Sequence, residues 1–429
     1  MQTENSLNRR QFLRQSALAG AGLLALSSTG SVRAAETPGK KIVVGVMGTN
    51  GRGMDHIAAY ASLSNVEIGY ICDVDNRALA KGITAVEKRQ GHKPKGVVDF
   101  RRILDDPDVD VLSIAAPNHW HAPATILACA AGKHVYVEKP CSHNPREGEL
   151  AVAAARKYRR IVQMGNQRRT WMKDAIQRLH AGEIGKVLFA RTWYNNHRPS
   201  IGRGQVAPVP EWLDYSLWQG PAPERPYKNN LIHYNWHWLW HWGNGELGNN
   251  GIHALDIARW GLGVEYPLRV TCGGSRYHYQ DDQETPDIYV TTFDFGESGA
   301  TWESHSCDPR GFEGTGFGIH FYGKKGSLVL AGSDCKIYDL NGKLVSEFRQ
   351  PSKDADHFAN FLEAIREGKR PNSDIEDGHK STLLCHLGNI AYRTGRTVNL
   401  DPQTHQIVGD NAAAAMWTRE YRQGWEPKV

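Results

Sequence analysis

Short apolar runs alternate with helical patterns between residues 41 and 164 of this 429-residue chain. Runs that are apolar at nearly every position predict strands buried on both faces, and the stretches between them predict covering helices. The expected strands are Lys41–Met47, Val66–Asp73, Val109–Ala115, His134–Glu138 and Ile161–Met164, and the expected helices are Asn76–Arg89, Ala122–Ala131 and Pro145–Tyr158. Apolar strands that alternate with helices predict a doubly wound parallel sheet over residues 41–164.

The pattern changes beyond residue 164, where strand-like segments follow one another with few helices between them. Short turns such as Gly323–Gly326 favour antiparallel pairing. The expected strands are Val187–Tyr194, Arg269–Gly273, Ile288–Phe295, Ala300–His305, Gly318–Tyr322 and Ser327–Leu330, with helices over Gly251–Trp260, Asp354–Glu367 and Glu376–Arg393. We therefore expect a second α/β domain over residues 165–429, with a mostly antiparallel sheet.

The first 35 residues have the pattern of a twin-arginine export signal. Asn8–Arg14 carries paired arginines, and the apolar run Ala17–Leu26, which is too short to span a membrane, leads to small residues ending at Ala35. We expect residues 1–35 to be a cleaved leader that the twin-arginine translocase reads, and the mature protein to lie in the periplasm or elsewhere outside the cytoplasm. Four arginines against one glutamate place +3 of the formal +5 charge in this leader, so the charge gives no reason to expect a nucleic-acid partner.

A glycine-rich turn follows the first expected strand. Such a turn aims backbone N–H groups and a helix N-terminus at a pyrophosphate, and glycine lets the backbone approach closely. Asn50 occupies the second glycine position of the G-x-G-x-x-G fingerprint, where asparagine tolerates a positive φ better than most residues. We expect the whole turn to bind a dinucleotide in a Rossmann-type domain: Gly48, Thr49, Asn50, Gly51, Arg52 and Gly53.

Asp73 ends the second expected strand, at the place where dinucleotide-binding domains carry an acidic residue. A carboxylate there binds the ribose hydroxyls of NAD and repels the 2′-phosphate of NADP. NAD is therefore the expected cofactor. Arg77 lies close enough in sequence to keep NADP as the less favoured alternative.

Polar side chains follow the next two strands, after Val109–Ala115 and at the end of His134–Glu138. Ligands of open parallel sheets bind outside the carboxyl ends of the strands, so we expect the nicotinamide there. A partly desolvated Lys139 beside a cationic nicotinamide would have a lowered pKa and could act as a base or proton donor, whereas the alternative is a surface lysine in a turn. Beyond the glycine turn, we expect the cofactor to contact Pro117, Asn118, His121, Glu138, Lys139 and Gln167.

Taken in order, these motifs resemble the glucose–fructose oxidoreductase and inositol dehydrogenase (Gfo/Idh/MocA) family. The similarity rests on Gly48–Gly53, Asp73, the triplet Glu138-Lys139-Pro140 and the helix start Gly251-Ile252-His253, and it extends over nearly the whole chain after the leader. It implies an N-terminal Rossmann domain, followed by a domain whose open, mostly antiparallel sheet carries the substrate pocket and the contacts of a homodimer or homotetramer. It also implies that Lys139 orients the substrate and relays protons, and that His253 is an acid or base.

One position departs from the family pattern. Asn249 stands where the family has the aspartate of an Asp-x-x-x-His pair. Asparagine can hydrogen-bond a hydroxyl, but it cannot tune His253 as a carboxylate does. The expected catalytic residues are Lys139, His253 and Asn249, and the sequence leaves Lys139, His253, His119 and His121 as alternative bases.

The segment from residue 195 to 250 is rich in Trp, His, Pro, Asn and Gly and shows little regular pattern. Its aromatic content argues against disorder, and sugar rings bind between aromatic faces and polar side chains, so we expect it to bind substrate. A structural loop or an oligomer interface is the alternative. His237 and His241 have a spacing compatible with a metal, but no Glu-x-x-His or cysteine cluster supports one, so no metal is expected. The expected substrate-binding residues are His119, Tyr194, His197, Arg198, Trp236, His237, Trp238 and Trp240.

These observations favour an exported, NAD-dependent oxidoreductase that acts on a carbohydrate or polyol. An enzyme outside the cytoplasm cannot draw on a free nicotinamide pool, so it should hold its cofactor tightly and regenerate it in place. The alternative within the family is an NAD-dependent glycosidase, in which transient oxidation, elimination and addition of water hydrolyse a glycoside. A second alternative is a non-catalytic, nucleotide-bound sugar-binding protein. The retention of Lys139 and His253 argues against it, whereas the loss of the aspartate at Asn249 favours it slightly.

Overall fold

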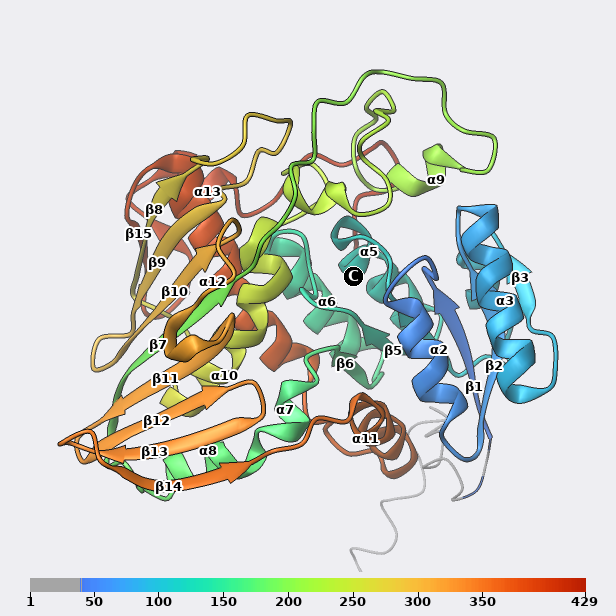
Figure 1. Cartoon of the computed structure of the whole chain (residues 1–429). Coiled ribbons are helices and arrows are strands. Elements are labelled where there is room, and N and C mark those ends of the chain that lie inside the picture. The colour runs from blue at the N-terminus through green and yellow to red at the C-terminus, as the bar shows by residue number, and fades with distance from the viewer. Residues whose placement is uncertain (1–38, 40) are drawn as a thin grey trace, which may run out of the picture.

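The computed structural model describes residue 39 and residues 41–429. The expected leader, residues 1–35, lies outside the described residues. Within the described part of the chain, no helix is both long and apolar enough to cross a membrane. Two sheets, each with helices packed against it, make up the molecule (Figure 1).

Six parallel strands form the N-terminal sheet, in the order β3-β2-β1-β4-β5-β6. They are β1 (Ile42–Met47), β2 (Val66–Cys72), β3 (Lys95–Val97), β4 (Val111–Ile114), β5 (His134–Val137) and β6 (Val162–Met164). The predicted parallel sheet is confirmed, and its strands β1 and β4 are almost fully buried. Strand order reverses between β1 and β4, which opens a crevice at their carboxyl ends. Strand β3 was not predicted because its three residues form a largely exposed edge.

The helices of this domain are α2 (Gly53–Ala61), α3 (Asn76–Gln90), α4 (Arg101–Leu104), α5 (Asn118–Ala130) and α6 (Pro145–Lys157). Local sequence explains their ends: the Asp75 side chain caps the N-terminus of α3, and Gly91 ends it in the left-handed conformation with a φ of 73°. Helix α5 begins at Asn118 rather than at the expected Ala122. The segment Asn118–His121 therefore forms its first turn, at the mouth of the crevice.

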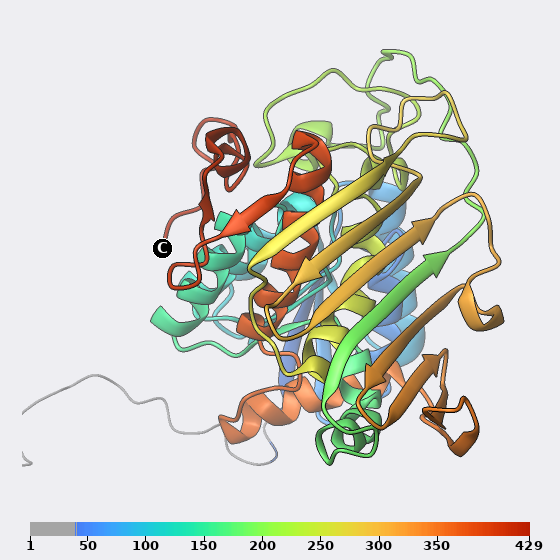
Figure 2. The ribbon, with the colours of Figure 1, turned by 90° about the vertical axis from the view of Figure 1, so that its left-hand side faces the viewer.

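Ten strands form the second sheet, in the order β14-β13-β12-β11-β7-β10-β9-β8-β15-β16. They are β7 (Val187–Asn195), β8 (Arg269–Ser275), β9 (Ile288–Asp294), β10 (Gly299–His305), β11 (Phe317–Gly323), β12 (Gly326–Ala331), β13 (Asp334–Asp339), β14 (Leu344–Arg349), β15 (Val398–Leu400) and β16 (Ile407–Val408). Paired strands are antiparallel except β7 and β10, which are parallel. The mostly antiparallel sheet is thereby confirmed, and Figure 2 shows its strands side by side.

Helices α10 (Ile252–Leu262) and α12 (Ile375–Thr394) pack against this sheet, with α8 (Lys173–His180) beside α10. Helix α12 is buried along most of its length because it also contacts α6 and β6 of the first domain. The remaining helices are α7 (Arg168–Trp171), α9 (Tyr215–Gln219), α13 (Asn411–Ala415), and the short η1 (Asn235–Trp238), η2 (Leu247–Gly251) and η3 (Phe312–Gly314).

Helix α11 (Asp354–Glu367) has its expected bounds but packs on the first domain. Phe358 stacks on Tyr136 of β5, with ring centroids 4.3 Å apart, and Phe361 lies in the same core. The boundary expected at residue 164 therefore separates the two sheets, whereas the chain returns to the first domain at α11.

Residues 196–250, which we call the aromatic insert, pass above the crevice (Figure 1). The insert has a core of its own, formed mainly by Leu213, Tyr215, Trp218, Tyr227, Leu231, Trp236 and Trp242. Burial of these large side chains explains how a segment with little regular structure keeps a defined shape.

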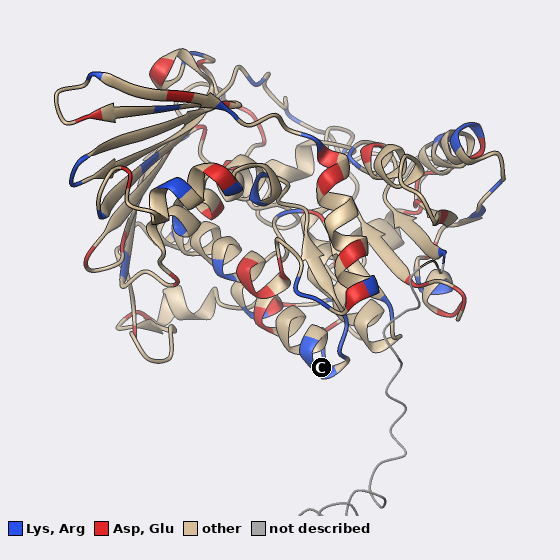
Figure 3. Ribbon diagram, turned by 90° about the horizontal axis from the view of Figure 1, so that it is seen from below, with Lys and Arg blue, Asp and Glu red and all other residues tan. Residues whose placement is uncertain are grey.

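Acidic and basic residues are interspersed along the helices seen from below (Figure 3). Many of them pair across elements, as Arg156 of α6 does with Asp374 at 2.5 Å. Asp374 is buried and Arg156 is about half exposed, so this pair is only partly screened by solvent.

Candidate active site

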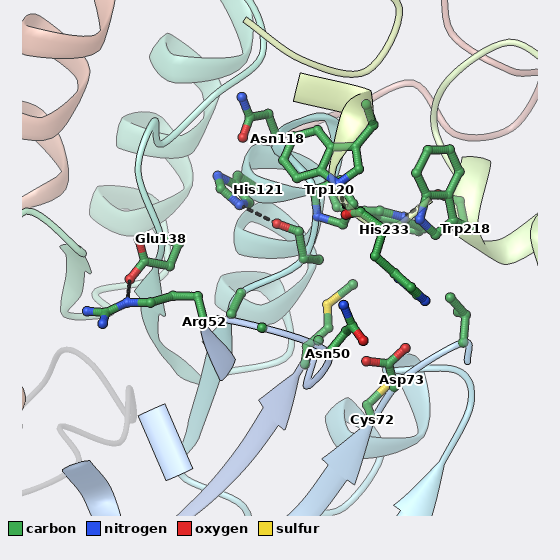
Figure 4. Close-up of a pocket in the computed structure, with 18 of the residues that line it drawn as sticks. Asn50, Arg52, Cys72, Asp73, Asn118, Trp120, His121, Glu138, Trp218 and His233 are labelled. Carbon is green, nitrogen blue, oxygen red and sulfur yellow. Dashed lines mark hydrogen bonds and ion pairs between the residues drawn. The ribbon is translucent and has the colours of Figure 1, made fainter. Parts of the chain in front are cut away.

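A cavity of about 530 Å³ lies at the carboxyl ends of the parallel strands. Residues after β1, β2, β4 and β5 form its floor, the start of α10 forms one side, and the aromatic insert covers it. Figure 4 shows Asn50 and Asp73 on one side of this cavity, with Trp218 and His233 of the insert above them. The cavity is thus shared between the two domains.

The glycine turn forms a cradle that side chains would fill. Gly48 has a φ of 87°, and a Cβ there would lie 2.7 Å from the Ala115 carbonyl oxygen. A Cβ on Gly53 would lie 1.7 Å from the Gly48 carbonyl oxygen, whereas one on Gly51 would meet nothing within 4 Å. Asn50 has an ordinary negative φ, so the expected left-handed conformation is not needed there. The tight turn, the open space at Gly51 and the N-terminus of α2 fit a pyrophosphate.

Asp73 lines the cavity and also holds the turn. Its Oδ2 accepts a hydrogen bond from the Thr49 backbone N–H at 2.7 Å, and its Oδ1 accepts one from the Asp75 N–H at 2.9 Å. Burial raises the pKa of Asp73, and these backbone hydrogen bonds oppose the rise. Arg77 is held elsewhere, paired with Asp75 at 2.8 Å and stacked 3.5 Å over the Trp212 ring.

A buried ion cluster fixes the end of β5 against the turn. Glu138 accepts a hydrogen bond from Arg52 Nε at 2.9 Å (Figure 4). It also lies 3.1 Å from His56 Nε2. Burial alone would raise the pKa of Glu138, but the Arg52 guanidinium and His56 hold it well below its usual range. Arg52 also pairs with Asp354 of α11 at 2.8 Å, so three distant segments meet beside Lys139.

Lys139 reaches from this cluster to the start of the second domain. Its Nζ donates to the Asn249 backbone oxygen at 2.8 Å and lies 3.3 Å from Asn249 Oδ1. Burial lowers the pKa of Lys139, and the carboxylates of Glu138 and Glu246 oppose that shift. A lysine with these surroundings can hold a substrate oxygen and exchange a proton with it.

His253, the second residue of α10, lines the cavity beside the end of β6. Its Nδ1 is 2.8 Å from Asn166 Oδ1, an acceptor, so Nδ1 carries the proton and Nε2 has a free lone pair. Burial, reinforced by Lys139 and Arg168, lowers the pKa of His253 well below its usual value. The imidazole is therefore neutral and available as a base.

Glu246 is a site residue that the sequence reasoning missed. Its side chain is fully buried and binds Arg198 through two hydrogen bonds, at 2.6 and 3.0 Å. Asn249 Nδ2 lies 3.5 Å from Glu246, and the Asn250 side chain also donates to it. A carboxylate thus lies beside Asn249, and it comes from a residue about one helical turn earlier in the chain. The spacing of three residues between Glu246 and Asn249 is the sequence signal from which this neighbour could have been predicted.

Most of the expected site residues line the cavity: Gly48, Asn50, Gly51, Arg52, Asp73, Pro117, Asn118, His121, Glu138, Lys139, Gln167, Trp236, His237, Asn249 and His253. Thr49 and Gly53 lie in the turn without lining it, and Tyr194, His197, Arg198, Trp238 and Trp240 lie outside. Trp240 lines a different cavity. The insert adds lining residues that were not predicted: Leu217, Trp218, His233 and Tyr234.

Two of the four candidate bases are occupied by structural contacts. His119 is fully buried outside the cavity, its Nε2 lies 2.9 Å from the Trp218 carbonyl oxygen, and burial lowers its pKa to about 3. His121 lines the cavity, but its ring nitrogens lie 2.6 and 2.7 Å from the carbonyl oxygens of Pro140 and Ala116. This geometry leaves Lys139 and His253 as the groups able to move a proton.

The aromatic insert presents stacked rings above the cavity. Trp236 and His237 stack with centroids 3.6 Å apart, and burial lowers the pKa of His237 to about 3. Within the described residues, no group of three or more His, Cys, Asp or Glu side chains is placed to hold a metal ion. The arrangement combines a nucleotide cradle, a proton-transfer pair and apolar platforms.

Comparison with protein families matches both domains. An oxidoreductase-family model described as an NAD-binding Rossmann fold matches residues 42–166, and one described as an oxidoreductase-family C-terminal alpha/beta domain matches residues 190–427. Curated relatives include glycosyl hydrolase family 109 proteins of Shewanella pealeana and Saccharopolyspora erythraea, at 31% and 32% identity over 211 residues. Each match covers 44% of this chain and 46% of the relative, so it spans about half of the relatives' length.

Solved structures share the fold. An aldose-aldose oxidoreductase from Caulobacter crescentus, complexed with glycerol, has a TM-score of 0.66 at 22% identity, covering 84% of this chain and all of that one. A levoglucosan dehydrogenase in complex with NADH and levoglucosan has a TM-score of 0.65 at 21% identity, covering 83% and 99%. The WlbA dehydrogenase from Bordetella pertussis, with NADH and UDP-GlcNAcA, has a TM-score of 0.64 at 20% identity, covering 84% and 99%.

Proposed function

Because the chain belongs to the Gfo/Idh/MocA oxidoreductase family, with its NAD-binding Rossmann domain, we propose that it oxidises a hydroxyl-bearing carbon of a carbohydrate or polyol. We further propose that NAD is the cofactor and that it stays bound between turnovers. The observation that carries the proposal is the pairing of Lys139 and His253 in one cavity with the glycine turn.

The two residues have complementary roles. NAD, when bound, accepts a hydride from the substrate carbon and can return it. His253 Nε2, with its lone pair free, takes the proton of the substrate hydroxyl, while the Lys139 ammonium donates a hydrogen bond to the same oxygen. Asn166 keeps the histidine in the tautomer that can accept a proton. The stacked rings of Trp236 and His237 offer an apolar platform to a sugar ring.

Retention of the cofactor is supported by how the insert closes the adenosine end of the cavity. His233 Nε2 lies 2.7 Å from Asp75, and the backbone N–H of Asn76 donates to the Trp212 oxygen at 2.9 Å. The N–H of Asp214 likewise donates to Val74 at 2.9 Å. These contacts tie the insert to the loop that follows Asp73, and they would slow the release of a nucleotide lying over Asp73. A cofactor-retaining enzyme would function outside the cytoplasm, where the proposed leader sends it.

The face of the second sheet turned away from α10 and α12 is the proposed oligomer contact. Apolar side chains of its strands are exposed there, among them Val290 at 41%. We propose a homodimer or homotetramer through this face. Sedimentation of the purified protein tests it, and a monomer at micromolar concentration would contradict it.

A glycosidase is the second candidate, supported by the identity to glycosyl hydrolase family 109 proteins. In that reaction, bound NAD would oxidise the sugar only transiently and would return the hydride to it once the aglycone had left and water had added. The protein, without added cofactor, should be incubated with a panel of glycosides and with free sugars plus a carbonyl acceptor. Oxidation that needs the acceptor supports the oxidoreductase, glycoside cleavage without it supports the glycosidase, and no turnover in either arm contradicts both.

A further inference from the structure

A second cavity, of about 710 Å³, shares no lining residue with the first. The loop after β5 supplies His143, the insert supplies Trp240, the C-terminal end of α12 supplies Arg393, and the segment after α13 supplies Arg419. Neither the proton-transfer pair nor the glycine turn reaches it. We call it the arginine cavity.

Three guanidinium groups line the arginine cavity without an acidic partner. Among the described residues, no carboxylate lies within 4.0 Å of Arg225, Arg393 or Arg419. Arg419 is half-buried, and its Nη1 contacts His143 Nδ1 at 3.1 Å. Because His143 Nε2 donates to the Trp240 oxygen at 3.1 Å, its Nδ1 is a neutral acceptor and supplies no countercharge.

Glu224 and Glu420 also line the cavity, but neither carboxylate lies within 4.0 Å of these three guanidinium groups. Glu224 pairs with Arg422 at 2.7 Å, and Glu420 is exposed. Glu147 is buried and accepts hydrogen bonds from the His143 N–H and the Tyr421 hydroxyl. Burial lowers the pKa of Arg419, and Glu147 only partly opposes the shift. A desolvated guanidinium without a bound carboxylate favours an oxyanion, which it can hold through two parallel N–H groups.

The cavity also has apolar walls, so a bare inorganic ion would leave most of it unused. Ile390 and Met416 line it, and the Arg393 guanidinium lies 5.3 Å from the Trp240 ring centroid. Aromatic faces bind the apolar faces of sugar rings, and arginine forks bind carboxylates. We propose that the arginine cavity binds a sugar acid, with its carboxylate against Arg419 and its ring near Trp240 and Arg393.

The test is calorimetric titration of the full chain with D-glucuronate, with glucose and with sodium sulfate. Glucuronate should bind one per chain, at least about tenfold more tightly than glucose, and more weakly as salt is added. The variants Arg419→Gln and Arg393→Gln should each weaken glucuronate binding at least about tenfold. Arg349→Gln, in which an exposed arginine of β14 is changed, is the matched control and should bind as the unaltered chain does.

Equal affinity for glucose and glucuronate would overturn the proposal. Glucuronate binding that neither arginine variant weakens would also overturn it, because the ligand would then lie in the first cavity. Sulfate that binds as tightly as glucuronate, with the same loss in the variants, would show an ion site and contradict the sugar acid. Arg393 is exposed, so its variant should fold even if Arg419→Gln does not.

Discussion

Lys139 is anchored more closely by the backbone of Asn249 than by its side chain: Nζ lies 2.8 Å from the carbonyl oxygen and 3.3 Å from Oδ1. The lysine therefore keeps its position whichever side chain residue 249 carries. The departure from the family's aspartate at this position changes the charge beside the lysine without releasing it. The nearby carboxylate of Glu246 supplies part of that charge instead.

Replacing the lysine should stop turnover without emptying the cofactor site. Lys139→Gln removes the ammonium that holds the substrate oxygen, and we expect kcat to fall by about 10²–10⁴-fold. Nucleotide content, measured by mass after denaturation, should not change. Lys369→Gln, which changes an exposed lysine, is the control. Activity in Lys139→Gln within about threefold of the unaltered chain would refute the role.

Changes at residue 249 distinguish its backbone from its side chain. Asn249→Ala should cost less than about tenfold in kcat/KM, because the carbonyl oxygen still holds Lys139. In Asn249→Asp, a carboxylate oxygen replaces the amide nitrogen that now faces Glu246. The two negative charges repel each other, so the melting temperature should fall. The double variant Asn249→Asp with Glu246→Gln should regain part of that loss. An Asn249→Asp protein that is more stable and more active would contradict this reading.

Asn166 should act through His253 rather than on the substrate. In Asn166→Asp a carboxylate faces Nδ1–H, which favours the imidazolium and raises the pKa of His253. As the pH falls, the histidine then gains its proton sooner, so the acid limb of the kcat profile should move to higher pH. Asn166→Ala, which loses the tautomer preference, should lower kcat about 10–100-fold with little change in KM. An unmoved acid limb in Asn166→Asp would exclude His253 as the base.

Two glycines of the turn should respond differently to alanine. Gly53→Ala brings a Cβ against the Gly48 carbonyl oxygen and should destabilise the fold by about 1–3 kcal/mol. Gly51→Ala has room for its methyl group and should keep its melting temperature while binding nucleotide less well, because the methyl enters the cavity. Denaturant unfolding and nucleotide content measure the two effects. Equal loss of stability in both variants would contradict the cradle geometry.

Buried histidines should make the fold sensitive to acid. Burial lowers the pKa of His386 to about 3 and that of His357 to about 4, against an unfolded value of about 6.5. Below about pH 6.5 the unfolded chain binds protons that the folded chain does not, so their contribution to stability is complete above that pH and is lost as the pH falls toward 4.

Each such histidine should cost about 1.4 kcal/mol of unfolding free energy per pH unit in this window. His386→Asn should flatten the slope between about pH 6 and 4.5, and His278→Asn, at an exposed position, should not. Identical slopes in the two variants would show that His386 is protonated in the folded protein.

The sequence predicted the elements whose burial is continuous along the chain. Strands β1 and β4 are apolar at most positions, so their pattern predicted both a parallel sheet and the residues that form these strands. Strands β13 and β14 were missed because their alternate residues are partly exposed and polar. Helix α11 was placed correctly in sequence, but no local pattern says which domain an amphipathic helix covers.

The candidate site was predictable where a motif is contiguous and not where it depends on distant contacts. The turn and Lys139 follow from local patterns, and both line the cavity. The burial of Glu246 by Arg198, which lies 48 residues earlier in the chain, has no local signature. The contact between Asp75 and His233 joins residues 158 apart. For the same reason Trp240 lines the arginine cavity rather than the expected substrate site.

The measurement that tests the central claim most directly is the nucleotide content of the protein purified without added cofactor. The protein is denatured, the released nucleotide is identified by mass, and its amount is compared with that of the chain. If the protein is an NAD enzyme that retains its cofactor, it should release NAD or NADH at close to one per chain. The Gly51→Ala variant should lose that nucleotide. Protein that folds normally and releases no nucleotide, or that releases NADP alone, would contradict the account.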